Sequence, residues 1–67
     1  MKYVYLVYED WHGLVGIYET SESATNRVKQ EILEGWPELL NQPVEYDSQW
    51  CWGWDGAAHW ERVEVLQ

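Results

Sequence analysis

The amino-terminal run Tyr3-Val4-Tyr5-Leu6-Val7-Tyr8 constrains the fold more than any other stretch of this chain. Its residues are all apolar or aromatic, and most are types that favour strands. Because successive side chains of a strand point to opposite faces, this strand would carry apolar side chains on both. The run therefore predicts a strand over residues 2–9 that lies inside its sheet and is at least partly covered on each face.

A second strand is expected over residues 14–18, after a polar connection of about five residues that ends in Gly13. The two strands would form a hairpin. Gly16 inside the second strand weakens it and indicates either a bulge or the close approach of a bulky ring. The tryptophan side chains are the candidates for that ring.

The pattern then becomes helical. A hydroxyl cap at Thr20 or Ser21 precedes a predicted helix over residues 22–34. Apolar residues recur at every fourth position, and this narrow stripe suits a helix that covers one face of a sheet. The last turn carries glutamates, which the helix dipole disfavours there. Gly35 ends the helix, and one further helical turn is expected over residues 36–41.

The last third of the chain predicts a second hairpin. Asp55-Gly56 lies between two strand-like runs and favours a two-residue turn, with a partner strand within residues 57–66. Trp60 is out of phase with the valines that follow it, so either a bulge lies beside it or it faces the other side of the sheet. The alternative is an irregular loop over residues 47–57 and a strand over residues 59–66 only.

These elements predict one α+β domain over residues 1–67. Their order is ββαβ or ββαββ, with an antiparallel or mixed sheet of three to four strands and one helix packed on one face. A chain of 67 residues lies near the lower size limit for a domain without disulfides or metal. Six Trp and five Tyr must therefore supply much of the core, and because each carries an N–H or O–H donor, we expect some rings to stay half-exposed.

The charge of the chain limits its partners. Twelve acidic residues against four basic ones give a net charge of −8, which argues against direct contact with nucleic acid or with an anionic membrane. Solubility or a basic protein partner explains such a charge. No apolar stretch reaches the roughly 20 residues of a membrane span. The single Cys51 allows no internal disulfide, and no signal peptide is recognisable, so a cytoplasmic location is expected.

No catalytic or metal-binding motif is recognisable. The spacing of Cys51, His12 and His59 matches no zinc pattern. Burial between two Trp rings would raise rather than lower the pKa of the Cys51 thiol, which argues against a nucleophile. Phosphate-binding glycine loops and nucleophile elbows are absent. We therefore expect no enzymatic activity and no cofactor.

Six residues are expected to contact a partner: Trp50, Trp52, Trp54, Trp11, Asp10 and Asp55. The alternating tryptophans could form a stacking platform for a flat ligand, an anchor for a protein partner, or simply the core of a small domain. An exposed aromatic patch could also contact the same patch of a second copy of the chain and so form a homodimer. The acidic residues would steer the protein toward a basic partner. If they align on one face, they would also imitate nucleic-acid phosphates and occupy a basic groove of that partner.

One segment resembles a known group of proteins. The run Val15-Gly16-Ile17-Tyr18-Glu19-Thr20-Ser21-Glu22-Ser23-Ala24 is similar to the strand-to-helix junction of small bacterial and phage proteins, and residues 60–65 are similar to their last strand. The tryptophans of residues 50–54 depart from that pattern. The resemblance implies a ββαβ accessory protein of a kind often encoded on mobile elements, and small acidic phage proteins often inhibit a host protein.

Two functional hypotheses follow. The preferred one is a non-enzymatic protein-binding module, in the form of a small acidic phage or mobile-element inhibitor of a host nucleic-acid-handling or defence protein with a basic surface. The alternative is a Trp-lined protein that sequesters a nucleotide or another flat small molecule, as a dimer. Binding of a charged partner should weaken with ionic strength, whereas ring stacking should not.

Overall fold

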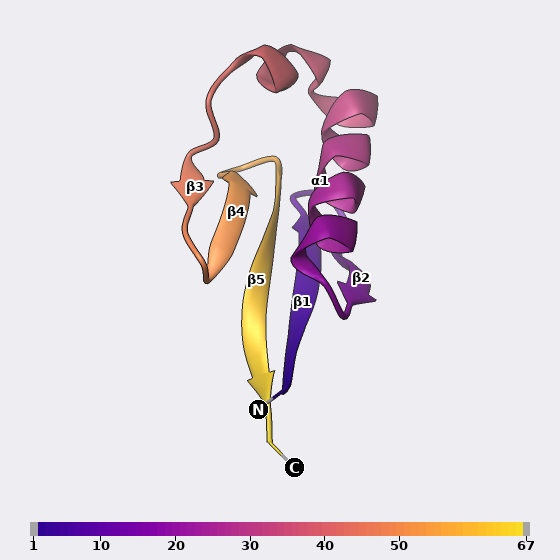
Figure 1. Ribbon diagram of the computed structural model, residues 1–67. Coiled ribbons are helices and arrows are strands. Elements are labelled where there is room, and N and C mark those ends of the chain that lie inside the picture. Colours follow the sequence, from indigo (N-terminus) through magenta and orange to yellow (C-terminus); the bar gives the residue numbers. More distant parts are fainter. Residues whose placement is uncertain (1, 67) are drawn as a thin grey trace.

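Among the described residues, one α-helix, one short 3-10 helix and a five-stranded antiparallel sheet make up the fold (Figure 1). The computed structural model describes residues 2–66. Its elements are β1 (Lys2–Glu9), β2 (Gly13–Tyr18), α1 (Ser21–Gly35), the short 3-10 helix η1 (Pro37–Asn41), β3 (Tyr46–Asp47), β4 (Cys51–Trp54) and β5 (Ala58–Val65). The α+β class and the single packed helix are as expected, but the sheet has five strands rather than three to four. The additional strand, β3, has only two residues, too few to leave a periodic pattern in the sequence.

The strand order is β2-β1-β5-β4-β3, so the two terminal strands lie side by side near the middle of the sheet. Their pairing runs without a break from Lys2 opposite Val65 to Glu9 opposite Ala58. Trp60 therefore faces the side of β5 opposite to its valines, and no bulge is needed there. The irregularity lies instead between β1 and β2, where the register shifts between Val7 and Tyr8.

The start and the end of the helix are each fixed by a capping hydrogen bond, and the sequence indicates only the first. Thr20 caps its start, because its Oγ1 accepts a hydrogen bond of 3.2 Å from the Ser23 amide. At the other end the Trp36 amide donates to the Ile32 carbonyl at 2.7 Å, so the helix includes Gly35 and the cap is Trp36. The connection from β1 to β2 holds three residues rather than about five.

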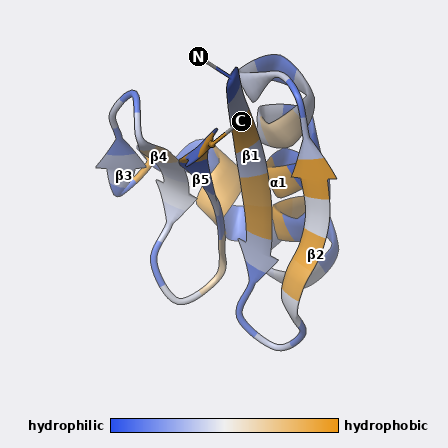
Figure 2. Ribbon diagram, turned by 90° about the horizontal axis from the view of Figure 1, so that it is seen from below, coloured by the Kyte–Doolittle hydropathy of each residue, from blue (hydrophilic) through white to orange (hydrophobic). Residues whose placement is uncertain are grey.

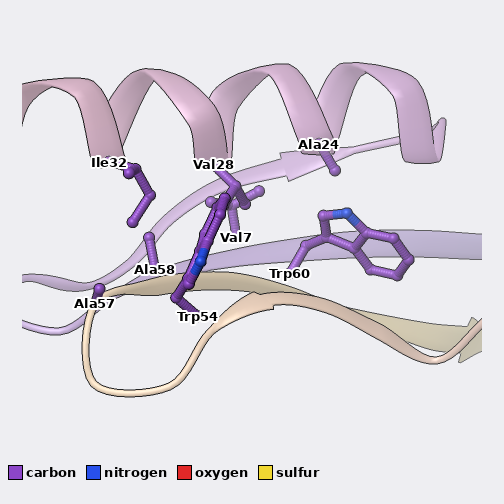
Figure 3. Close-up of a cluster of buried hydrophobic side chains, with 8 residues drawn as sticks. All are labelled: Val7, Ala24, Val28, Ile32, Trp54, Ala57, Ala58 and Trp60. Atoms are coloured by element: carbon purple, nitrogen blue, oxygen red, sulfur yellow. The ribbon is translucent and has the colours of Figure 1, made fainter. Parts of the chain in front are cut away.

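The core fills the space between α1 and the sheet (Figure 3). Its buried members are Val7, Ala24, Val28, Ile32, Trp54, Ala57, Ala58 and Trp60. Trp60 satisfies its ring N–H with the Thr25 hydroxyl, at 2.9 Å between Nε1 and Oγ1. The Trp54 ring N–H is buried and has no hydrogen-bond partner among the described residues. Two of the six tryptophans are thus core residues that link the helix to the second hairpin.

The second hairpin has a different turn from the expected one. Trp54 pairs with Ala58, which leaves a connection of three residues, Asp55-Gly56-Ala57, rather than the two-residue turn. Only Gly56 has a positive φ, of 73°, so the turn needs one left-handed residue and not two. The close contact expected at Gly16 is also present, but a tyrosine makes it: a Cβ built on Gly16 would lie 2.7 Å from the Tyr18 ring.

The helix covers one face of the sheet, and no element of residues 2–66 covers the other. Tyr5 and Val7 point to the helix, whereas the alternate residues of β1 point away from it. We call the side turned away from α1 the open face. The strands β1 and β2, which contribute to it, contain apolar stretches (Figure 2). The apolar residues of the open face are Val4, Leu6, Tyr8, Leu14, Ile17, Val63 and Val65. β1 thus lies inside the sheet as expected, but its face turned away from the helix is only partly covered, because Val4, Leu6 and Tyr8 are half-buried with no element of residues 2–66 above them.

Candidate functional site

The three alternating tryptophans do not form one surface. Trp54 is only 3% exposed and belongs to the core. Trp52 is half-buried and meets Trp54 edge to face, with ring centroids 5.4 Å apart and ring planes at 73°. Trp50 precedes β4 and is 50% exposed. Because the two strand tryptophans are nearly perpendicular and in contact, no flat ligand fits between them.

Trp50 instead contributes to a cluster around an arginine. The Arg62 guanidinium carbon lies 4.3 Å from the centroid of the Trp50 ring and 4.2 Å from that of Tyr3. The charge therefore lies over two aromatic rings, whose centroids are 6.3 Å apart and whose planes meet at 75°, a favourable environment for a guanidinium. This cluster ties the segment before β4 to β1, which gives Trp50 a structural role in the fold.

The predicted aspartates lie on the two turns at one end of the sheet. A hydrogen bond to Asp55 is the main cause that raises the pKa of Tyr46 above its ordinary value of 10.0, and burial of the phenol adds to it. The Asp10 amide donates to the Ala57 carbonyl at 2.8 Å, which joins the β1–β2 turn to the β4–β5 turn. The Asp10 side chain is exposed.

The structure brings Trp11 to a cleft that the sequence does not reveal. β1 and α1 run in the same direction, so the end of each element lies toward the same end of the molecule (Figure 1). Between them is a cleft of about 300 Å³, at the lower end of the range for small-ligand sites. We call it the acidic cleft. It is lined by Glu9, Trp11, His12, Glu31, Glu34, Gly35 and Trp36.

Glu9 fixes the turn that carries Trp11. Its buried carboxylate accepts hydrogen bonds from the Trp11 amide at 2.7 Å and the His12 amide at 3.1 Å, and it also contacts the His12 ring nitrogen Nδ1. The bond from the Trp11 amide is the main cause that lowers the pKa of Glu9, and the bonds from His12 add to it while burial opposes it. The turn is thus held from within, and the Trp11 side chain projects from it with 80% of its surface exposed.

The opposite wall of the cleft is the carboxyl end of α1. Glu31 is compensated by Arg27, whose Nε and Nη2 each lie 3.0 Å from Oε1. Glu34 has no ion pair within residues 2–66, and the last turn of the helix carries no basic residue. Since the helix dipole also places negative potential at this end, the wall of the cleft attracts cations.

Two indole rings and an uncompensated carboxylate favour one class of ligand. An ammonium or guanidinium group gains from the faces of Trp rings and from the nearby carboxylate together. A phosphate or other anion would be repelled. No group of three or more His, Cys, Asp or Glu that could hold a metal ion occurs among the described residues.

Only part of this cleft was predictable from the sequence. Of the six predicted partner-binding residues, Trp11 lines it and Asp10 lies beside it in the same turn; Trp50, Trp52, Trp54 and Asp55 lie elsewhere. Trp36 and Glu34 were not among the predicted residues. The one signal for them in the sequence was the acidic last turn of the helix. Carboxylates there oppose the helix dipole and so lower the stability of the helix itself, which indicates another role.

Comparison with known proteins adds no relative to these observations: no family model, curated protein or solved structure matches the chain. No helix within residues 2–66 is long and apolar enough to span a membrane. The structure therefore defines only the class of protein: a small α+β domain with a helix on one sheet face and an acidic, tryptophan-lined cleft at one end.

Proposed function

We propose that this protein is a non-enzymatic binding module that holds a basic side chain of a protein partner in the acidic cleft. The observation that carries the proposal is the exposed Trp11 opposite Glu34, at a helix end without basic residues. An exposed Trp on a fixed turn is the kind of residue that dominates binding energy in protein interfaces. The preferred ligand is an arginine or lysine side chain, because its stem packs on the rings while its charge meets the carboxylate.

The particular form of this proposal is an inhibitor of a host nucleic-acid-handling or defence protein. Such proteins carry basic surfaces for nucleic acid, and a net charge of −8 would steer this chain toward them. The alternative of a nucleotide-sequestering protein gains no support from the cleft, because its carboxylates repel phosphates.

The test uses an arginine-rich peptide and its citrulline counterpart, which has the same shape without the charge. We expect the arginine peptide to shift the indole N–H signals of Trp11 and Trp36 in a nitrogen-15 correlation spectrum, and to leave that of Trp50 in place. Trp11→Ala should weaken binding roughly two- to thirtyfold, the range expected for losing a cation–π contact. Raising the salt concentration should weaken it further.

Trp50→Ala is the matched control, because it removes another exposed tryptophan outside the cleft. Glu34→Gln removes the uncompensated charge and should weaken binding while leaving the ring contacts. A host protein from a bacterial lysate that is retained by the wild-type chain and by Trp50→Ala, but released by Trp11→Ala, would be the partner. Equal binding of the arginine and citrulline peptides would refute the proposal.

A further inference from the structure

The open face of the sheet is a second surface that the acidic cleft does not use. Ile17 is 61% exposed there, and Leu14 and Val63 also rank among the exposed large apolar residues. Leu6 and Val4, from the strand next to them, remain half-buried without any element on top. Contiguous apolar surface of this kind marks an interaction site in a folded protein.

This face carries few of the charges of the chain, whose net charge is −8. The strand pairings place two charged strand residues on it, Lys2 and Glu61, and Lys2 is paired with Glu19, at 3.8 Å between Nζ and Oε1. Glu61 also has the His59 ring nearby, at 3.5 Å between Oε2 and Nε2. The other acidic strand residues, Glu9, Asp47 and Glu64, point to the helix side. A basic partner therefore has little reason to dock here, whereas two acidic molecules can approach each other through this face.

The size of the face fits a weak, reversible contact with a second copy of the chain. Strands of 8, 6, 4 and 8 residues, at about 3.3 Å per residue and about 4.8 Å between strands, give roughly 400 Å² per molecule, so two such faces bury roughly 800 Å², below the size of a permanent interface. Association would add stability to a small domain that has a single cysteine and, among the residues described, no metal cluster.

We propose that a second copy of this chain covers the open face, so that the two sheets pack against each other in a symmetric dimer. Two sheets of the same twist pack with their strands about 30° apart and share one apolar layer. Ile17 and Leu14 of each copy lie in that layer. The acidic clefts stay outside it, because they are built on the helix side, and the dimer presents two of them. This inference stands independently of the function proposed for the cleft.

The experiment is sedimentation equilibrium on the full chain at concentrations up to about 0.5 mM. We expect a monomer–dimer equilibrium that Ile17→Lys weakens roughly thirtyfold or more, because it places an unpaired charge in the interface. Leu33→Lys is the matched control, since Leu33 is 60% exposed but lies on α1. Added salt should strengthen the dimer by screening the repulsion between two acidic chains, the opposite of its effect on the cleft.

Circular dichroism and urea unfolding of both variants check that each is folded. The Cys51 thiol gives a second readout, because Cys51 pairs with Glu61 and so lies on the open face. Its modification should slow as the protein concentration rises. A folded wild-type chain that remains monomeric at about 0.5 mM would overturn the proposal. So would a dimer that Ile17→Lys leaves intact, or one that Leu33→Lys disrupts equally.

Discussion

Replacing Gly53 by alanine should destabilise this protein more than the same substitution at any other glycine. Gly53 is buried in β4 with φ of 140°, a conformation that residues with a side chain rarely adopt. A Cβ at this position would lie 2.5 Å from the Ala58 carbonyl oxygen and 2.5 Å from the His59 Cα. Both are backbone atoms of β5, so no side chain can rotate away to make room.

The cost follows from two separate effects. The backbone strain of a residue held in a sparsely populated conformation is about 1–3 kcal/mol. Forcing a methyl group against fixed atoms adds about 1–3 kcal/mol. The sum, about 2–6 kcal/mol, compares with a total stability of about 3–10 kcal/mol for a domain of this length. Gly53→Ala should therefore remove a large part of the stability or prevent folding.

The assay is urea unfolding followed by tryptophan fluorescence and circular dichroism, with Gly35→Ala as the matched control. Gly35 is the last residue of α1, and a Cβ there would meet nothing within 4 Å. The same chemical change should stabilise the protein there, by up to about 1 kcal/mol. With a urea slope near 1 kcal/mol/M, the two midpoints should move in opposite directions, by about 2 M or more for Gly53→Ala. Equal and small shifts would show that β4 does not approach β5 as the structure has it.

Two further predictions concern the turn and the core. The pKa of Glu9 is lowered from 4.5 in the fold, so its contribution to stability is present above pH 4.5 and is lost as the pH falls through the lower folded value. Glu9→Gln should therefore reduce the stability at pH 7 and flatten its decline in acid, as measured by urea unfolding across pH. Thr25→Val leaves the Trp60 N–H buried without its acceptor and should cost about 1–3 kcal/mol. Thr25→Ser keeps the hydroxyl and should cost less; equal costs would mean that the hydrogen bond contributes nothing.

Local patterns determined the elements that lie within one stretch of the chain. Six neighbouring apolar residues were enough to place β1 at residues 2–9, because strand preference depends on the immediate sequence. Thr20 marked the start of the helix, since a capping side chain bonds an amide three residues on. The Asp-Gly pair located the second hairpin, but its turn length depends on how β4 and β5 pair.

The candidate site was predictable only in part, because its two walls come from segments that are far apart in the sequence. Trp11 was among the residues predicted from the sequence, but the other wall of the cleft comes from a segment that begins twenty residues later, at Glu31. Nothing in the sequence near Trp11 indicates that the end of α1 will lie opposite it. The three alternating tryptophans were a stronger signal, yet the structure gives each a different environment.

The sequence by itself thus determined the α+β class, the amphipathic helix and the acidic character of the surface, since these depend on composition and on residues close together in the chain. The tertiary structure alone decided which tryptophans are buried, that two residues suffice for a fifth strand, and that one sheet face has no cover within residues 2–66. Those features depend on which elements pair and pack together, such as β1 with β5 and β3 with β4. Burial is a property of what lies opposite a residue, and here the opposite residue is usually far away in sequence.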